Sequence, residues 1–394
     1  MHLFVVRPAA WLAAVKLIFC LVVFALLLPG RANSQADPIK IGLITDESGA
    51  LELYGLEQEY GLRLGLDYAT EGTMEISGRP IEIVLRDYEN DPALVESQAR
   101  DLIENEDVDI LVGAPSSAAT ETLIALAAEY NVILMMGPAS DPRLTNELAS
   151  PMTFRVCANA DQIARAAAIG TVQEDTTFIQ IAPDHAFGYA WTAAYERAYL
   201  MQGATFAANP IYIPTDTENF GPYWQQAADS GADRFIITWI GSSTGALFQQ
   251  AFEAGIATEQ IITGFYSNNM THVFSSLAEI GAVGPIIYHY SLPDNSVNDW
   301  LVEQHHTMYN DVPDQFTECG FATGQALAYA LEQTDGSTAP SALIQALETL
   351  EWDGPKGHYT MEDHQAVMPI YIVRLISIDD PDQLYYELVN EVIP

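Results

Sequence analysis

Apolar positions along the chain follow two alternating periods, which predict strands followed by helices. The stretch Ile39–Thr45 is almost continuously apolar, as is typical of a central strand buried on both faces. A helical period then runs from about Leu56 to Thr70, and Arg79–Asp87 alternates as a strand does. The next helix is expected over Asp91–Glu104, with a proline at its first position. Strands that alternate with helices in this way predict a doubly wound parallel α/β sheet.

The stretch Asp109–Thr145 continues this rhythm and places polar groups at one edge of the predicted sheet. Its pattern indicates strand, loop, helix, strand and loop, with Ser116 and Ser117 at the start of the helix and Ser140 after the second strand. Parallel strands joined by a helix end at the sheet edge where that helix begins. Hydroxyl groups, free backbone N–H groups and the positive end of the helix dipole should therefore meet there. Such an edge suits a small anion, especially a carboxylate, although any strand–helix–strand unit can carry capping serines.

The pattern restarts after a short extended stretch, Thr153–Cys157, and produces a second series. Its expected strands are Thr177–Ala182, Thr205–Ile213, Arg234–Trp239 and Gln260–Thr263. Its expected helices are Asp161–Gln173, Gly188–Met201, Phe220–Ser230 and Thr244–Ala254. After a second extended stretch, Pro285–His289, the expected elements are helices Val297–Tyr309, Phe316–Glu332 and Ser341–Glu351, then strands near His358–Met361, Met368–Leu375 and Leu384–Leu388. Two such series indicate two α/β lobes.

The charge of the chain narrows its possible partners. It has 53 acidic and 15 basic residues, for a formal net charge of −38, and the acidic residues are scattered along the chain. So negative a surface argues against nucleic acid and against anionic membrane surfaces as partners. A solubility adaptation to salty surroundings and a cationic partner both agree with this composition.

Residues 1–36 have the pattern of a secretory signal. Arg7 and Lys16 supply a positive start, and Leu17–Leu28 supplies an apolar core that is short for a membrane span. We expect cleavage after Ala36 and export to the periplasm, with a retained N-terminal anchor as the alternative. Two cysteines then remain in the chain. One disulfide in an oxidising compartment and two separate buried thiols both agree with the sequence.

Motifs for catalysis or metal binding are weak. His305 and His306 are adjacent on an expected helix, so they face different directions, and no HExxH spacing surrounds them. Ser117 has no GxSxG context, and the sequence contains no GxGxxG or Walker-type loop and no cysteine pair with zinc spacing. We therefore expect no enzymatic activity, no metal and no cofactor. Ser117 or His185 would be the catalytic candidates if the chain were an enzyme.

Aromatic residues gather at or just after the ends of the predicted strands. They are Tyr54, Phe187, Trp239, Phe265 and Tyr266. Ligands of doubly wound sheets bind at this edge, although a single aromatic there is more often part of the core. Five of them, from both series, favour an organic ligand with an apolar or aromatic body.

Several segments resemble the periplasmic solute-binding proteins of ABC importers of the branched-chain amino acid type. The segments are IKIGLITDESGALELYG, GRPIEIVLRDYENDPALVESQARDLI, VGAPSSAAT, GPASDPRLT, TFRVCANADQ and GHYTM. The resemblance extends from Pro38 to the C-terminus. It implies the type I periplasmic binding fold, in which two doubly wound, Rossmann-like lobes joined by three hinge crossovers close over a ligand. We expect residues 37–156 and 290–365 to form the N-terminal lobe and residues 157–289 and 366–394 the C-terminal lobe.

The resemblance and the aromatic residues at the strand ends together predict a set of ligand-binding residues. They are Tyr54, Ser116, Ser117, Pro138, Ala139, Ser140, Phe187, Trp239 and Tyr266. In the family a serine after the third strand holds the ligand carboxylate, which matches Ser117 with Ser116 beside it. A backbone carbonyl and a small hydroxyl residue after the fourth strand hold the α-amino group, and these fall near Pro138–Ser140. Aromatic residues at Tyr54 and Phe187 contact the ligand.

Two departures from the family pattern bear on the ligand. Members that bind α-amino acids carry an acid after the strand that here ends near Thr263, where this chain has Phe265 or Tyr266. The first-lobe disulfide of the family is also absent, because its positions fall on Asn90 and Ser116. A buried ammonium without an acidic partner would be unfavourable. An aromatic or other apolar carboxylate, or an amide, therefore fits better than an aliphatic amino acid.

These inferences together predict a secreted, monomeric binding protein that delivers a small carboxylate-bearing solute to ABC permease subunits in the membrane. No nucleic-acid partner is expected. The alternative is a ligand-sensing receptor of the same fold that passes occupancy to a regulatory partner.

Overall fold

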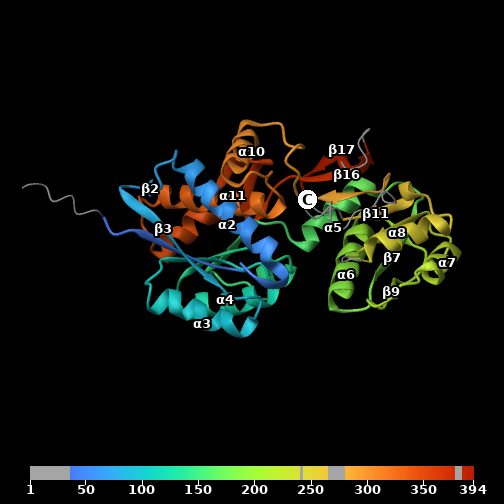
Figure 1. Ribbon diagram of the computed structural model, residues 1–394, viewed down its shortest axis with the longest axis horizontal. Coiled ribbons are helices and arrows are strands. Elements are labelled where there is room, and N and C mark those ends of the chain that lie inside the picture. The colour runs from blue at the N-terminus through green and yellow to red at the C-terminus, as the bar shows by residue number, and fades with distance from the viewer. Residues whose placement is uncertain (1–35, 240–242, 265–279, 378–383) are drawn as a thin grey trace, which may run out of the picture. The chain divides into compact units, whose positions relative to one another are not determined.

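Two sheets organise the computed structural model, which describes residues 36–239, 243–264, 280–377 and 384–394. The elements below all belong to one unit, Pro38–Pro394. Among the described residues, the first sheet has nine strands in the order β13-β14-β15-β6-β5-β4-β1-β3-β2. The second has eight in the same described part of the chain, in the order β17-β16-β12-β11-β10-β7-β8, with β9 also paired to β7 (Figure 1).

The strands that lie centrally in both sheets are parallel, as the sequence predicted. The strands of the first sheet are β1 (Ile39–Thr45), β2 (Glu75–Ile76), β3 (Arg79–Asp87), β4 (Ile110–Gly113), β5 (Ile133–Met136), β6 (Thr153–Arg155), β13 (Glu351–Gly354), β14 (Gly357–Glu362) and β15 (Gln365–Val367). Those of the second are β7 (Thr177–Pro183), β8 (Thr205–Phe206), β9 (Ile211–Ile213), β10 (Arg234–Ile237), β11 (Ile261–Thr263), β12 (Val283–Ile286), β16 (Ile370–Ser377) and β17 (Leu384–Val392). In the first sheet β1 pairs in parallel with β3 and β4, while in the second β10 does so with β7 and β11. Antiparallel strands extend the edges, where β16 pairs with β12 and β13 with β14.

Helices cover both faces of each sheet. They are α2 (Glu52–Ala69), α3 (Pro92–Glu104), α4 (Ser117–Tyr130), α5 (Ala160–Thr171), α6 (Ala186–Met201), α7 (Gly221–Asp229), α8 (Thr244–Glu253), α10 (Ser296–Tyr309), α11 (Gln315–Gln333) and α12 (Pro340–Glu348). Ile39, Ile41 and Leu43 of β1 share a buried cluster with α2, α11 and α12, whereas Ile44 of β1 packs with α3 and α4. The near-continuous apolar run of β1 is thus buried on both faces. Within the described part of the chain, no helix has both the length and the apolar character that spanning a bilayer requires.

Capping side chains fix where several helices begin. The Asp91 carboxylate accepts from the N–H of Ala93 at 2.9 Å, ahead of the proline at the start of α3. Asn159 and Gln162 form a reciprocal capping box at the start of α5. These caps explain why the sequence placed the starts of α3 and α5 within one residue of those observed.

Several predicted elements differ in extent from those observed, and two of these differences have a local physical cause. The single strand expected over Thr205–Ile213 is two short strands, β8 and β9, that pair with different parts of β7. Pro210 lies between them and has no N–H to donate to a sheet, so the pairing is interrupted there. The helix expected over Ser341–Glu351 ends at Glu348, because the chain turns into β13.

The chain changes sheets three times, as the resemblance implied. It passes from β6 to β7, returns between β12 and β13, and passes again from β15 to β16. The lobe limits at residues 156, 289 and 365 stay predictions, because strand pairing shows which strands belong to each sheet but not where each lobe ends.

Glycines allow α2 and α11 to pack backbone against backbone. Gly61 and Gly65 are four residues apart on α2, and Gly320 and Gly324 have the same spacing on α11. A Cβ atom on Gly61 would lie 2.0 Å from the Thr317 carbonyl oxygen, and one on Gly320 would lie 2.4 Å from a backbone oxygen of α2. Any larger side chain would therefore separate these helices, which lie side by side (Figure 1). This contact places the start of α11 beside the start of α2.

Candidate functional site

A cavity of about 250 Å³ lies at the carboxyl ends of the parallel strands, with walls from both sheets. Residues that follow strands of the first sheet line one side of it: Pro115, Ser117, Pro138, Ser140, Cys157 and Ala158. Residues at or after strand ends of the second sheet line another: Phe187, Ile237, Thr238, Trp239, Thr263, Gly264, Pro285 and Ile287. The remaining lining residues come from helices α2, α5, α6 and α11 and the turn before α2. This is the edge at which doubly wound sheets bind ligands.

Six of the nine residues predicted to contact a ligand line this cavity. They are Tyr54, Ser117, Pro138, Ser140, Phe187 and Trp239. Ser116 and Ala139 are not in the lining, and their roles are described below. Tyr266, like Phe265, lies outside the described residues.

The loop between β4 and α4 is held by backbone contacts that set the position of Ser117. Gly113 has a φ of +145°, and a Cβ atom there would lie 2.3 Å from the Ile44 carbonyl oxygen, so only glycine fits. The hydroxyl of Thr120 accepts from the Ala114 N–H at 3.2 Å and lies 2.9 Å from the Ser116 carbonyl oxygen. Ser116 itself caps α4, since its Oγ accepts from the backbone of the first turn. Ser117 is left to face the cavity.

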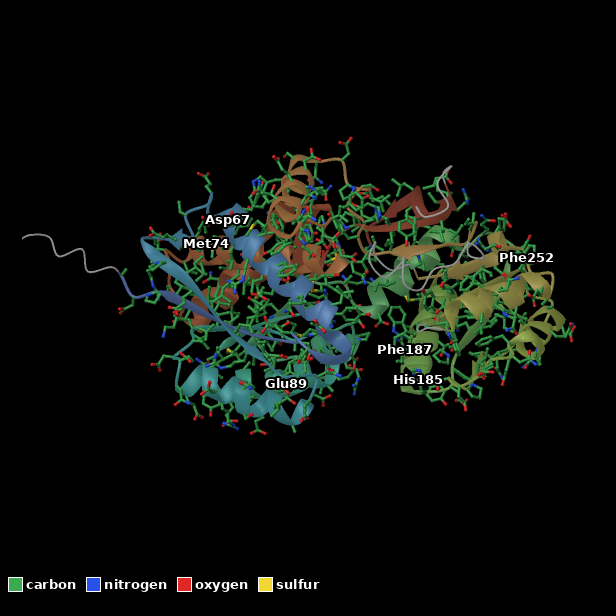
Figure 2. The ribbon with its side chains drawn as sticks, in the orientation of Figure 1. Asp67, Met74, Glu89, His185, Phe187 and Phe252 are labelled. Carbon is green, nitrogen blue, oxygen red and sulfur yellow. A yellow bond between two sulfur atoms is a disulfide. The ribbon has the colours of Figure 1, made fainter. Side chains whose placement is uncertain are left out.

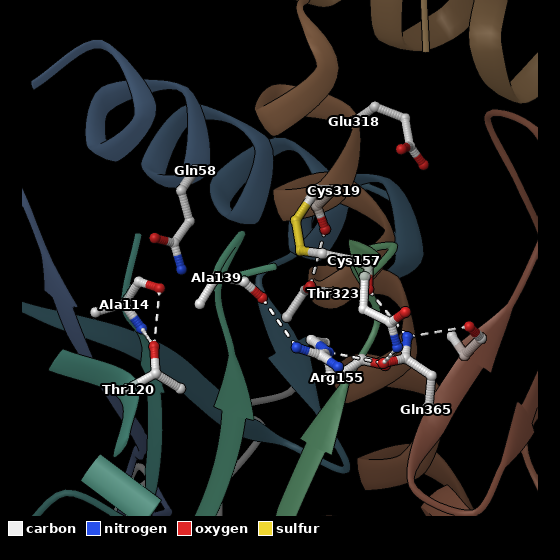
Figure 3. The surroundings of a disulfide bond; sticks show 12 residues. Gln58, Ala114, Thr120, Ala139, Arg155, Cys157, Glu318, Cys319, Thr323 and Gln365 are labelled. Carbon is white, nitrogen blue, oxygen red and sulfur yellow. Dashed lines mark hydrogen bonds between the residues drawn. A yellow bond between two sulfur atoms is a disulfide. The ribbon is translucent and has the colours of Figure 1, made fainter. Parts of the chain in front are cut away.

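Arg155, which is fully buried, fixes the loop after β5. Its Nη1 donates to the carbonyl oxygens of Ala139 at 3.0 Å and Asp141 at 2.8 Å, and its Nη2 donates to the Thr145 hydroxyl at 2.7 Å. Burial lowers the pKa of Arg155 to about 10, which leaves it protonated at neutral pH. The resemblance placed a ligand-binding carbonyl near Pro138–Ser140, and within this stretch the Ala139 carbonyl already accepts from the Arg155 guanidinium (Figure 3). Ser140 lies between the two anchored carbonyls in the sequence and lines the cavity.

Gln365 links the first and third passages of the chain between the sheets. Its Oε1 accepts from Arg155 at 2.7 Å, and its Nε2 donates to the Cys157 carbonyl oxygen at 3.0 Å. One residue further on, the Ala366 carbonyl oxygen accepts from the Gln162 amide at 2.8 Å. The segments that connect the sheets are therefore tied to each other beside the cavity (Figure 3).

Cys157 and Cys319 form a disulfide, with their Cα atoms 5.1 Å apart. The sequence had left open whether these residues were bonded. The bridge joins the segment after β6 to the first turns of α11, and both cysteines line the cavity (Figure 3). One covalent bond thus connects a passage between the sheets to the helix that packs on α2.

On the side of the second sheet, the aromatic residues are held by neighbours outside the cavity. His185 caps α6, because its Nδ1 accepts from the Phe187 N–H at 3.2 Å, and Figure 2 shows both residues at the start of that helix. Trp239 donates from its indole nitrogen to the Ser243 hydroxyl at 3.1 Å and meets the Phe220 ring edge to face at 5.6 Å. His185 itself is not among the lining residues.

The cavity wall contains an acidic residue from a part of the chain that the sequence analysis did not connect with the site. Among the described residues that line the cavity, none is basic and one is acidic, Glu318. Its carboxylate lies 3.2 Å from the ammonium of Lys356, accepts from the Tyr359 hydroxyl, and is buried together with both. The sequence analysis missed this acid. The sequence did contain a signal for a special role of Lys356, because it is one of only two lysines after Asp37.

Tyr54 contributes a phenol that stays protonated. Burial, with Glu57 and Asp314 nearby, raises the pKa of Tyr54 to about 12. Its ring packs against Phe316 with the ring centroids 4.5 Å apart. The first turns of α2 and α11 therefore present an aromatic surface that includes the neutral hydroxyl of Tyr54.

The two histidines considered for a metal lie in different environments. His305 is buried, with Nδ1 2.9 Å from the Asp311 carbonyl oxygen, and His306 is exposed. Within the described ranges, no group of three or more His, Cys, Asp or Glu side chains is placed to hold a metal ion.

Comparison with known proteins places these features in a family. A family model described as periplasmic binding protein matches residues 38–380. An ABC-type branched-chain amino acid transporter from Rhodopseudomonas palustris CGA009 is 31% identical over 90% of this chain and 96% of its own, with a TM-score of 0.82. No curated protein matches the chain.

Two more distant solved structures share the fold. One is a solute-binding protein of an ABC transporter from R. palustris in complex with 4-hydroxybenzoate, at 20% identity, with 91% of this chain and 97% of that one covered and a TM-score of 0.76. The other is a leucine-binding protein from Thermotoga maritima MSB8, at 18% identity, with coverage of 90% and 99% and a TM-score of 0.73.

Proposed function

Because this chain belongs to the periplasmic binding protein family, we propose that it traps a small carboxylate-bearing organic solute in the cavity and delivers it to ABC permease subunits. It is a substrate-binding protein of the type I fold and not an enzyme. Residues 1–36 would direct export to the periplasm and be removed after Ala36, leaving a monomer.

Ser117 and Ser140 would hold the carboxylate. Both line the cavity, and Ser117 is the first residue of α4. The N–H groups of the first turn of a helix have no acceptor within that helix, and its dipole favours negative charge there. Since the described lining contains no basic side chain, hydroxyl and backbone donors would hold the anion. The position of Ser117 at the start of α4, with Ser140 lining the same cavity, is the observation that carries the proposal.

Aromatic side chains would contact the body of the solute. Tyr54, Phe187, Trp239 and Phe316 all line the cavity, together with Trp191, whose ring centroid is 5.9 Å from that of Phe187. At about 250 Å³ the cavity is at the small end of ligand sites, which favours a compact solute. The 4-hydroxybenzoate bound to one structural neighbour is such a carboxylate, which supports an aromatic or apolar acid here.

A thermal-shift screen over amino acids, aromatic acids, short organic acids and amides should identify carboxylates that raise the melting temperature. For the best of them, Ser117→Ala is expected to weaken binding roughly 10- to 100-fold, as a hydrogen bond to a charged group is lost. Isothermal titration calorimetry measures the affinity. Mass spectrometry of the recovered compound should show it unchanged.

The control is Thr122→Ala, further along α4 and outside the cavity lining. It should leave affinity unchanged. Equal affinities of wild type and Ser117→Ala would refute the assigned carboxylate site, and a screen in which no carboxylate binds would refute the function.

A further inference from the structure

The hydroxyl of Thr238 is buried in the cavity wall without a partner. Thr238 follows β10, lines the cavity and is only 7% exposed. Its backbone N–H donates to the Ile181 carbonyl oxygen at 2.9 Å, which fixes the residue against β7. Among the described residues, its Oγ1 has no hydrogen-bond partner. A buried hydroxyl without a hydrogen-bond partner lowers the stability of the folded state. A ligand atom that pairs with it gains a hydrogen bond without first having to remove water from the hydroxyl.

Thr238 belongs to a different part of the wall from the proposed carboxylate site. It stands between Ile237 and Trp239 at the carboxyl end of the second sheet, whereas Ser117 and Ser140 follow strands of the first sheet. A solute whose carboxylate is held by the serines would therefore present another part of itself to Thr238. Thr238 is buried and stands between two apolar residues, Ile237 and Trp239, so a hydrogen bond to its hydroxyl counts for more than one exposed to water.

The charges of the cavity wall limit which group can meet this hydroxyl. An ammonium group would need an acid to compensate its burial, and the acid of the described lining, Glu318, is already paired with Lys356. A second anionic group would need a cation, and none of the described lining residues is basic. A neutral group that donates or accepts a hydrogen bond meets neither penalty.

We propose that Thr238 determines which solute the cavity accepts, by hydrogen-bonding a neutral hydroxyl, phenol or carboxamide on the part of the solute remote from its carboxylate. This inference rests on the proposed function and adds a second recognition point to it. A carboxylate without such a group leaves Thr238 unpaired and binds more weakly. A carboxylate with an ammonium in that place is rejected.

The test uses compounds that share a body and differ in one group. The probes are benzoate, 4-hydroxybenzoate, 4-carbamoylbenzoate and 4-(aminomethyl)benzoate, with butyrate, 4-hydroxybutyrate and 4-aminobutyrate as an aliphatic set. Affinities are measured by isothermal titration calorimetry on the mature chain. In the set that binds, wild type should favour a neutral hydroxyl or amide member over the parent acid by about tenfold, and the ammonium member should bind most weakly.

Thr238→Val keeps the shape of the side chain and removes its hydroxyl. It should bring the ratio between the affinity for the hydroxyl or amide member and that for the parent acid to about one, chiefly by weakening the binding of the hydroxyl or amide member. The ligand-free melting temperature should stay the same or rise, because an unpaired buried hydroxyl is removed. Thr205→Val makes the same change at an exposed position on β8 of the same sheet, and it should preserve the wild-type ratio.

The possible results separate this inference from the proposed function. If carboxylates bind and Ser117→Ala weakens them, but Thr238→Val leaves the ratio unchanged, the function stands and the role of Thr238 is overturned. Tighter binding of the ammonium members by wild type also overturns it. If no carboxylate of the wider screen binds, the function fails and this inference fails with it.

Discussion

Replacing Cys157 and Cys319 with serine should lower the free energy of unfolding by about 5 kcal/mol. The two residues are 162 positions apart in the sequence, so their bond closes a long loop and removes much of the conformational freedom of the unfolded chain. Urea denaturation of the double variant and of the oxidised wild type measures the difference. Affinity should fall as well, because both side chains line the cavity.

Two controls separate loss of the bond from loss of the sulfur atoms. Wild-type protein unfolded in the presence of a reductant should match the double variant, since it keeps both side chains without the bond. The single variant Cys157→Ser should match it too. A change below about 1 kcal/mol would mean that the bond does not constrain the unfolded chain as its loop length requires.

Lys356→Met should destabilise the fold by about 3–5 kcal/mol, because it leaves the carboxylate of Glu318 buried without its cation. The side chains of Lys356 and Glu318 are 1% and 2% exposed, so water cannot replace the lost partner. The double variant Lys356→Met/Glu318→Leu removes both charges and should recover most of the loss. A double-mutant cycle by urea denaturation measures the coupling between them.

The ion pair of Arg374 with Glu387 provides a matched comparison at the surface. Its atoms are 2.6 Å apart, closer than those of the buried pair, but its side chains are 41% and 52% exposed. Arg374→Met should therefore change stability by no more than about 1 kcal/mol. Similar losses at the two sites would show that burial of the Glu318 carboxylate does not set the size of the effect.

The parts of the fold that depend on local pattern could be predicted from the sequence. The apolar run of β1 predicted a strand covered on both faces, and Asp91 with its proline marked the start of α3. Because strand ends define the sheet edge, the same pattern predicted Ser117 and Ser140 at the edge of one sheet and Phe187 and Trp239 at the edge of the other. The resemblance implied that the two lobes close over one ligand. The cavity lining contains all four.

The parts that depend on distant residues could not be predicted. Cys157 pairs with Cys319, and Glu318 with Lys356, only because the packing of α11 brings them together, and no local pattern encodes such a meeting. Ser116 and Ser117 were both predicted to contact the ligand. Adjacent residues at the start of a helix point in different directions, so Ser116 caps α4 while Ser117 lines the cavity. The unpaired state of Thr238 likewise follows from what surrounds it and not from its own type.

The backbone contact between α2 and α11 had a signal in the sequence that was not used. The paired glycines, four residues apart on each helix, are a pattern for close approach of two helices. They matter for the site because α2 carries Tyr54 and α11 carries Phe316 and Glu318. Precise packing far from the strand ends thus fixes one side of the cavity.

Two indole rings in the cavity wall should make the intrinsic tryptophan fluorescence of the protein sensitive to ligand binding. Trp191 and Trp239 both line the cavity, whereas Trp224, Trp300 and Trp352 do not. A solute that enters should displace water from these two rings and alter the emission of the protein without any attached label. An aromatic solute can also accept excitation energy from them, so an aliphatic and an aromatic ligand should leave different spectral signatures. Replacing either tryptophan with phenylalanine would then show which part of the wall a given solute touches.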